Sequence, residues 1–275
     1  MRKTPILLAL CSCMNATPLY ASFEFAPTDP RGVAMSGALA AVAGDAFGMR
    51  YNPAAPSLSK GITVGAAYDI PYGKRDLSSL SGAATWSNLP FDRHGAIAAS
   101  AGRFAPNGYR EQTVSTGYSR TLTPSIHAGI SVSRNSLSID GMPARSADGI
   151  NAGFMAELRP ALIVGIGSFN LNAPTIDGGL TKLPRTTLAG FSYRFDNGNM
   201  LTANVQADPD RPSRLLGAGA FGILPSMVVM MGVGTNPSVI SAGTGIEAAG
   251  VRATGAISRN IDLGTTAALG LELKL

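Results

Sequence analysis

The amino-acid sequence predicts an all-β protein, an antiparallel transmembrane β-barrel of about 14 strands with a short N-terminal hatch. Three observations predict this fold. From Gly61 onward, segments of roughly ten residues alternate apolar with small or polar residues, as membrane-barrel strands do. The links between these segments include both tight and long ones. After the N-terminus, no apolar run approaches the roughly 20 residues of a spanning helix. A membrane crossing would therefore need a closed barrel.

The composition favours a lipid-facing surface over a soluble enzyme. Charged residues make up only 14% of the chain, against about 25% in soluble domains. Hydrophobic residues reach 45%, although aromatic residues account for only 7%. The net charge is +5, but Lys and Arg are scattered singly, so the sequence has no basic stripe of the kind that binds nucleic acid. We therefore expect membrane lipid, and no nucleic acid, among the partners.

Residues 1–21 have the features of a secretory signal peptide. Arg2 and Lys3 form a basic start, residues 6–10 form a short apolar core, and Ala21 is a small residue at the cleavage position. Both cysteines lie in this segment, so cleavage would leave a mature chain without a thiol. An alternative is a lipoprotein signal in which Cys13 carries the lipid.

Residues 22–60 differ from the remainder and predict a hatch with short helical pieces. They contain an Ala-rich stretch followed by Asp45, lack clean alternation, and end near an Asn52–Pro53 pair. Asn followed by Pro favours a turn, and Pro is not tolerated in a central strand. Residues 61–275 then form the barrel.

The barrel segments can be counted from their alternation and turn residues. In the last one, Leu269, Leu271 and Leu273 share one face while Gly270 and Glu272 share the other, because successive side chains of a strand point to opposite sides. An even strand number is usual in bacterial barrels. Candidate strands are 61–69, 79–87, 95–103, 111–120, 124–134, 150–158, 161–170, 185–195, 199–207, 213–223, 226–235, 238–247, 250–259 and 264–275.

Loop lengths indicate two different rims. Tight links occur at 121–124, 159–160, 196–198 and 224–225, and longer ones at 70–78, 136–149 and 171–184. Short turns on one rim and long loops on the other are typical of outer-membrane barrels.

Three segments, 161–169, 215–221 and 227–233, are apolar or small on both faces. They favour either packing against a plug or a passage for an apolar ligand, and the two interpretations are compatible. Candidates to line the interior on these segments are Ile163, Leu216, Met227 and Met231.

The predicted inner faces also carry a few polar candidates. His127 shares a face with Ser125, and a Ser–His pair with an orienting carboxylate could serve a lipid-modifying enzyme, although the sequence does not supply that carboxylate. Arg252 is a further candidate. The inner charges are expected to pair with one another and to hold the barrel and hatch together: Asp69, Glu157, Arg159, Glu247, Arg252, Glu272 and Lys274. No His, Cys or carboxylate pair has metal-ligand spacing, so we expect no metal or cofactor.

The N-terminal segment resembles the start of FadL-like and PorV-like outer-membrane proteins. Those proteins begin with an Ala-x-Met-x-Gly run, followed by an Ala-rich piece with an Asp and then by Asn-Pro-Ala. The corresponding residues here are Ala34, Met35, Gly37, Asp45, Tyr51, Asn52, Pro53 and Ala54. The sequence departs from that pattern at Ser36 and Ala55, where the family usually has Gly. The resemblance implies a hatch inside the barrel, with Asn-Pro-Ala where hatch meets wall.

The resulting hypothesis is passive uptake of hydrophobic small molecules, of the fatty-acid or hydrocarbon class, by a non-enzymatic barrel. It implies the outer membrane of a Gram-negative-type cell, a hydrophobic ligand and the barrel-assembly machinery as partners. Three alternatives remain open: a non-transporting scaffold or secretion accessory, a lipid-modifying barrel enzyme, and a soluble secreted β-protein.

Overall fold

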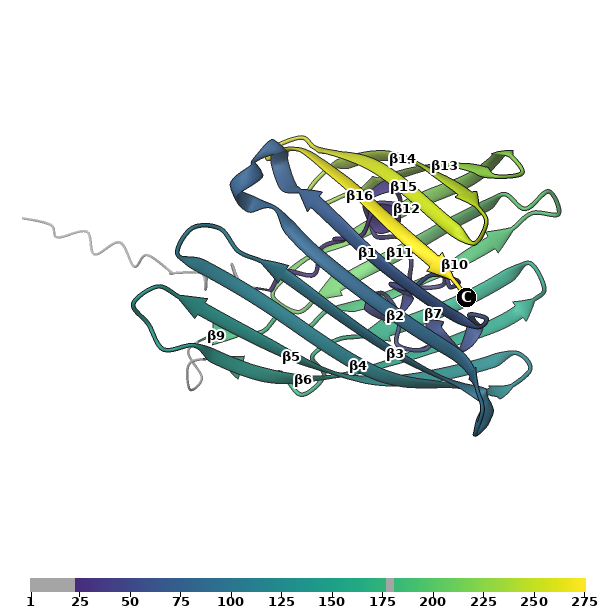
Figure 1. Ribbon diagram of the computed structural model, residues 1–275, viewed down its shortest axis with the longest axis horizontal. Helices are drawn as coiled ribbons and strands as arrows, with labels where there is room; N and C mark the ends of the chain where they lie inside the picture. The colour runs from purple at the N-terminus through teal and green to yellow at the C-terminus, as the bar shows by residue number, and fades with distance from the viewer. Residues whose placement is uncertain (1–22, 177–180) are drawn as a thin grey trace, which may run out of the picture.

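The computed structural model describes residues 23–176 and 181–275. The signal-peptide prediction for residues 1–21 lies outside these described residues. Fourteen antiparallel strands close into a barrel, in the order β1-β16-β15-β14-β13-β12-β11-β10-β7-β6-β5-β4-β3-β2, and Figure 1 shows the N-terminal segment inside it. The predicted fold class is confirmed. Within the described ranges, no helix is both long and apolar enough to cross a membrane.

The strand bounds lie within a few residues of the predicted ones, except that β5 ends five residues later and β6 begins five residues earlier. The barrel strands are β1 (Ile62–Ile70), β2 (Ser79–Leu89), β3 (Asp92–Phe104), β4 (Tyr109–Thr123), β5 (Ile126–Ile139), β6 (Arg145–Arg159), β7 (Leu162–Ser168), β10 (Thr187–Arg194), β11 (Met200–Asp208), β12 (Arg211–Leu224), β13 (Met227–Gly234), β14 (Val239–Ala248), β15 (Val251–Asn260) and β16 (Gly264–Lys274). A separate two-stranded sheet joins β8 (Thr175–Ile176) to β9 (Thr181–Lys182).

The first and last strands close the barrel. β1 pairs with β16 from Thr63 opposite Lys274 to Ile70 opposite Ala267, and the ladder ends with Ile62 and Leu275 exchanging backbone hydrogen bonds of 3.2 and 2.8 Å. Closure leaves no sheet edge, so every backbone group of the seam has a partner where lipid offers none.

Side chains alternate across the wall as the sequence predicts. On β16, Leu269 is 67% exposed on the outside, whereas its neighbour Ala268 is 2% exposed on the inside. Large apolar side chains such as Ile130, Leu201 and Ile257 are exposed on the outer face of other strands. An apolar outer band is the surface that a bilayer requires.

The two rims differ in their connections. The rim that carries residues 71–78, 169–176 and 181–186 is called the long-loop rim, and the opposite rim, with turns such as 124–125 and 225–226, is called the short-turn rim. Two 3-10 helices, η3 (Pro71–Gly73) and η4 (Arg75–Leu77), form the β1–β2 loop. The predicted long loop at 136–149 is wrong, because β5 and β6 continue their pairing to Leu137 opposite Arg145. Leu137 and Ala147 are buried there beneath Ile176 and Leu183 of the next loop.

Residues 23–60, called the hatch below, contain one short α-helix and two 3-10 helices. These are α1 (Pro30–Ala34), η1 (Gly48–Arg50) and η2 (Ala55–Leu58). α1 contacts β13 to β16, whereas η2 contacts β2 to β5. The hatch therefore crosses the lumen from one half of the wall to the other.

Candidate functional site

The hatch begins with a well-capped turn of helix. Asp29 precedes α1, and its Oδ1 accepts a hydrogen bond of 2.8 Å from the Gly32 amide, which satisfies one of the free N–H groups at a helix start. Pro30 occupies the first helical position, where its missing N–H costs nothing. The chain then reverses at Ser36 and Gly37, which both have positive φ, and Gly37 adopts such a conformation without a Cβ clash.

The first part of the hatch is buried against the inner faces of β10 to β16, called the apolar wall below. Val33, Ala34, Met35 and Leu39 form one cluster with wall residues from this half. The wall members of that cluster are Leu188, Met200, Leu216, Met230, Ala256 and Ala268. Burial of so many apolar side chains is the main force that holds this part in place.

Hydroxyl groups of the same wall bind the hatch backbone. Ser192 donates to the Ala41 carbonyl at 2.7 Å, Thr202 to that of Ala38 at 3.1 Å, and Ser241 to that of Ala34 at 2.8 Å. Ser241 also shares a hydrogen bond of 2.7 Å with the Ser36 hydroxyl. Carbonyls in an irregular buried segment need such partners, so these hydroxyls fix the path of the hatch.

The Asn-Pro-Ala segment meets the wall in the middle of the barrel. Asn52 is fully buried, and its Nδ2 donates to the carbonyls of Ala40 at 2.7 Å and of Phe154, on β6, at 3.2 Å. Its Oδ1 accepts from the Ala54 amide at 2.9 Å. Gly129 and Gly153 lie against Pro53 so closely that a Cβ on either would collide with it. Asn52 therefore joins two parts of the hatch to the wall.

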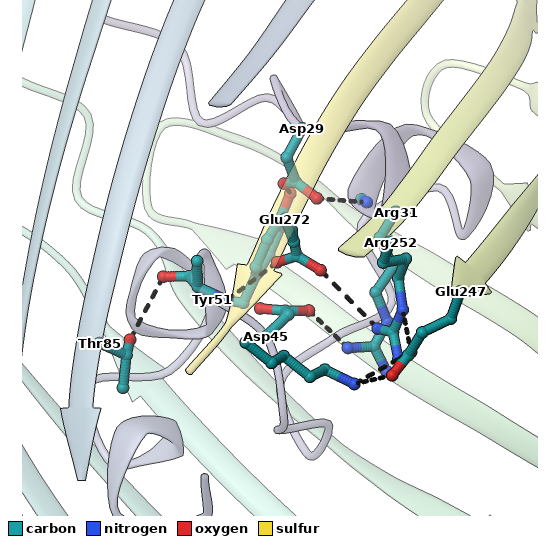
Figure 2. Close-up of polar contacts among 11 residues, drawn as sticks. Asp29, Arg31, Asp45, Tyr51, Thr85, Glu247, Arg252 and Glu272 are labelled. Atoms are coloured by element: carbon teal, nitrogen blue, oxygen red, sulfur yellow. Dashed lines mark hydrogen bonds and ion pairs between the residues drawn. The ribbon is translucent and has the colours of Figure 1, made fainter. Parts of the chain in front are cut away.

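A cluster of six charged side chains joins the hatch to β14, β15 and β16 (Figure 2). Arg31 pairs with Asp45 inside the hatch. Arg252 lies between two carboxylates, with Glu247 at 2.6 Å and Glu272 at 3.7 Å. The cluster is completed by Lys274, whose Nζ is 2.8 Å from Glu247, and by the Ala46 amide, which donates to Glu272 at 2.9 Å. The cluster therefore contains equal numbers of acidic and basic side chains, three of each.

A second buried contact ties the two ends of the hatch. The Tyr51 hydroxyl donates to Asp29, so η1 is joined to the cap of α1. Burial, together with the charge of Asp45, raises the pKa of Asp29, while hydrogen bonds from Tyr51 and Gly32 act in the opposite direction. Burial and the charge of Asp29 raise the pKa of Tyr51 well above its usual value. The pair thus holds the proton on the phenol.

His127 lies inside the barrel, near the short-turn rim. Its Nδ1 is 3.2 Å from the Ser57 hydroxyl and 3.0 Å from the Thr121 hydroxyl, and its Nε2 is 4.0 Å from Glu157. Ser125 is not among these partners. Ser57 itself donates to the Ala54 carbonyl at 2.9 Å, so its proton is already engaged. The histidine joins η2 to the wall in this arrangement, and neither cavity described below reaches it.

The four apolar residues predicted to line the interior do not all lie on the inner face of the barrel wall. Ile163 packs with Ala54 and Met155 inside the barrel, and Leu216 belongs to the hatch cluster. The expectation that Met227 and Met231 line the interior is wrong. Met231 is 52% exposed on the outside, whereas Met230 is 3% exposed on the inside, and Met227 has the same phase as Met231. The segment is apolar on both faces, so its alternation could not be read from the sequence.

Two cavities flank residues 24–28 at the start of the hatch. The larger one, of about 650 Å³, lies at the long-loop rim and is lined by residues such as Tyr72, Pro237 and Leu263. The smaller one, of about 190 Å³, lies against the inner faces of β2 to β6 and is called the vestibule below. Those inner faces, called the polar wall, carry hydroxyls and amides at the vestibule: Ser79, Ser81, Ser100, Thr113, Ser115, Ser131, Ser133, Asn135 and Asn151.

The floor of the vestibule is formed by Met49, Arg50 and Tyr51 of the hatch. Below them, η2 packs against β2 to β5 and closes the short-turn side, where Ser87 donates to the Pro56 carbonyl at 2.8 Å. Phe25 and Phe169 form a side of the vestibule, with ring centroids 4.9 Å apart. The space is large enough for several water molecules or one small organic molecule.

Sequence reasoning missed Asp29, Arg31 and Arg50, and it named Tyr51 only as part of the family resemblance. The Asp29–Pro30 pair is a recognisable helix start, since Asp is a preferred cap and Pro a preferred first residue. The contacts of Arg31 with Asp45 and of Tyr51 with Asp29 depend on how the hatch folds back on itself, and no local pattern encodes that path.

No family model and no curated protein matches this sequence. Solved structures match it in fold. The CymD monoaromatic hydrocarbon channel aligns with a TM-score of 0.69 at 12% identity, covering 92% of this chain and 99% of that chain. The toluene transporter TbuX of Ralstonia pickettii aligns with a TM-score of 0.67 at 10% identity, covering 92% and 100%. A FadL homologue of Pseudomonas aeruginosa aligns with a TM-score of 0.66 at 12% identity, covering 90% and 98%. This chain has the fold of these barrels.

Proposed function

We propose that this protein is an outer-membrane channel for the passive uptake of small hydrophobic molecules of the hydrocarbon or fatty-acid class. The observation that carries the proposal is a closed barrel whose lumen is occupied by a hatch but retains an aromatic-sided vestibule next to a rim cavity. Proteins of the same fold include a monoaromatic hydrocarbon channel and a toluene transporter. The ligand class is carried over from them as part of this proposal.

The vestibule supplies apolar contacts of the kind that such ligands need. Phe25 stacks at a tilt on Phe169 and meets Tyr51 edge-on at 6.3 Å. Apolar and aromatic side chains with a few polar groups are the usual lining of small-molecule sites. A small apolar molecule that enters from the long-loop rim would meet this aromatic group before the floor.

The outer surface supports the proposed location. Its exposed apolar side chains occur on strands all around the barrel, for example Leu80, Phe154, Leu215 and Leu271. Export by residues 1–21 and insertion by the barrel-assembly machinery belong to the same proposal.

The test is uptake of labelled toluene and labelled fatty acid by cells with and without the full-length protein. We expect faster uptake of at least one of them when the barrel is present and shown to be folded by heat-modifiable migration on gels. Equal uptake for both compounds and for related ligands would refute transport.

The scaffold alternative is favoured by one observation. The six-residue charge cluster and the buried Asn52 hold the hatch firmly to the wall, as a permanent plug would require. A scaffold predicts no uptake in the wild type, so the same experiment separates the two functions.

A further inference from the structure

Arg50 has an unusual position for a charged residue inside a barrel. It ends η1 and lies at the floor of the vestibule, and its Nη1 reaches β3, where a Cβ built on Gly102 would be 3.5 Å away. Within residues 23–176 and 181–275, the Arg50 guanidinium forms no hydrogen bond and no ion pair with another residue. A partly buried guanidinium has five donors and is normally paired.

The two carboxylates that interact electrostatically with Arg50, those of Asp29 and Asp69, already have hydrogen-bond partners. Asp29 accepts hydrogen bonds from Tyr51 and from the Gly32 amide. Asp69 accepts from Ser79. Higher in the cavity, Glu111 accepts from the Phe23 amide at 3.0 Å and from Tyr109, and Glu24 pairs with Arg211 at 2.7 Å. The donors of Arg50 therefore remain directed into the vestibule.

The polar wall offers a second unpaired donor. Asn135 is 5% exposed and lines the vestibule. Its Oδ1 accepts from Thr113 at 2.9 Å, but its Nδ2 has no hydrogen-bond partner among the described residues. A buried amide N–H₂ without a partner costs free energy. The Asn135 Nδ2 is itself enclosed by neighbouring atoms, so Arg50 is the residue whose unpaired donors can reach a ligand in the vestibule.

We propose that the vestibule binds a small organic carboxylate, an acid of about the size of benzoate. Its carboxylate lies against the Arg50 guanidinium, which suits planar two-oxygen acceptors, and its apolar part lies beside Phe25 and Phe169. Serine and threonine hydroxyls of the polar wall complete the polar contacts. The assignment refines the ligand class of the proposed function and rests on it only for passage across the membrane; binding itself is independent of transport.

The test is equilibrium dialysis of labelled benzoate against the purified, folded full-length barrel in non-ionic detergent. We expect saturable binding by the wild type. Loss of a charge-assisted contact in Arg50→Met should weaken it about tenfold or more, and Arg50→Lys should restore part of the affinity. The matched control is Arg75→Met, because Arg75 is an exposed arginine of η4 that lines neither cavity.

Benzyl alcohol provides the ligand control, since it keeps the ring and lacks the charge. We expect it to bind the wild type at least about tenfold more weakly than benzoate, with little change in Arg50→Met. Absence of saturable benzoate binding, equal affinity in wild type and Arg50→Met, or equal binding of benzyl alcohol would each overturn the proposal. If Arg50→Met does not fold, the Arg50→Lys variant and the alcohol comparison decide.

The outcome is separable from that of the proposed function. Saturable benzoate binding that depends on Arg50, without any uptake of toluene or fatty acid, would keep the carboxylate site and refute hydrophobic uptake. Uptake of toluene by a barrel that does not bind benzoate would refute the carboxylate site and support hydrophobic uptake.

Discussion

The apolar wall and the polar wall face the same lumen but differ in how they contact the hatch. The apolar wall, in the upper part of Figure 1, buries α1 and the turn after it among Leu188, Met200, Leu216 and Met230. The polar wall is lined by Ser, Thr and Asn, and it contacts the hatch at η2, near the short-turn rim, and at Asn52–Pro53. The difference teaches that one half of the barrel buries the start of the hatch, whereas the other half holds its end and lines the vestibule.

The largest expected effect comes from removing residues 271–275. This deletion takes the end of β16 from its two neighbours, β1 and β15, and opens the seam of the half that anchors the hatch. An open sheet edge has no partners in lipid, so we expect no folded barrel in the membrane fraction. The double variant Leu271→Ala with Leu273→Ala keeps the backbone ladder and should still insert; normal insertion of the deletion variant would contradict the seam.

The two walls differ inside but share one outer surface, and Leu269→Arg tests that surface. Leu269 faces outward in the middle of β16, so the charge should cost about 2–4 kcal/mol of barrel stability. Leu275→Arg lies on the same face at the membrane edge and should cost about 0–1 kcal/mol. Both values follow from urea refolding in lipid vesicles. If the urea midpoint of Leu269→Arg equals that of the wild type, this face does not contact the bilayer core.

Gly232→Leu should disturb the anchored half alone. A Cβ at Gly232 would be 2.6 Å from the Met35 backbone carbon, so the larger side chain must displace the hatch at a cost of about 1–3 kcal/mol. Gly222→Leu is the matched control on the neighbouring strand, since a Cβ there meets nothing within 4 Å. We expect higher conductance in planar bilayers for Gly232→Leu only. Equal conductance of the two variants would argue against hatch anchoring at β13.

Arg252→Met should have a smaller effect. It leaves Glu247 and Glu272 without their shared partner, but Glu247 keeps Lys274 and Glu272 keeps the Ala46 amide, so we expect a loss of about 1 kcal/mol. Arg134→Met breaks a surface ion pair with Asp148; the Arg134 side chain is 65% exposed and that of Asp148 is 68% exposed. The change should cost less than about 0.5 kcal/mol of stability. Thermal unfolding of both variants measures the difference. An equal loss would mean that the charge cluster does not stabilise the hatch.

Much of the barrel could be predicted from the sequence, because alternation is a local signal. β16 and β5 show it clearly, since leucine or isoleucine alternates there with glycine or polar residues. The signal fails where both faces are apolar, as in β13, and Met231 was therefore assigned to the wrong side. It also fails where polar side chains continue a strand, as at Ser136 and Ser146, which pair although the segment reads as a loop.

The site was predictable only in part. The Asn52–Pro53–Ala54 segment could be located through its resemblance to a known hatch, and Arg252 through its inner phase. The vestibule could not be predicted, because its position depends on which half of the barrel wall the hatch packs against. Arg50 has no sequence signal at all; its unpaired state follows from Asp29 and Asp69 being engaged by Tyr51 and Ser79.

The central claim, that the turn after α1 is anchored to the apolar wall and leaves the polar wall free at the vestibule, can be tested by a single cross-linking measurement. Cleavage of residues 1–21 would remove both native cysteines, which leaves a clean background. In the variant Ser36→Cys with Ser241→Cys, the two hydroxyls it replaces are 2.7 Å apart, close to the roughly 2 Å of a disulfide. We predict near-complete cross-linking on mild oxidation of folded barrels. In Ser36→Cys with Ser131→Cys, which pairs the hatch turn with the polar wall, we predict none. Cross-linking to Ser131→Cys, or its absence at Ser241→Cys, would contradict the account.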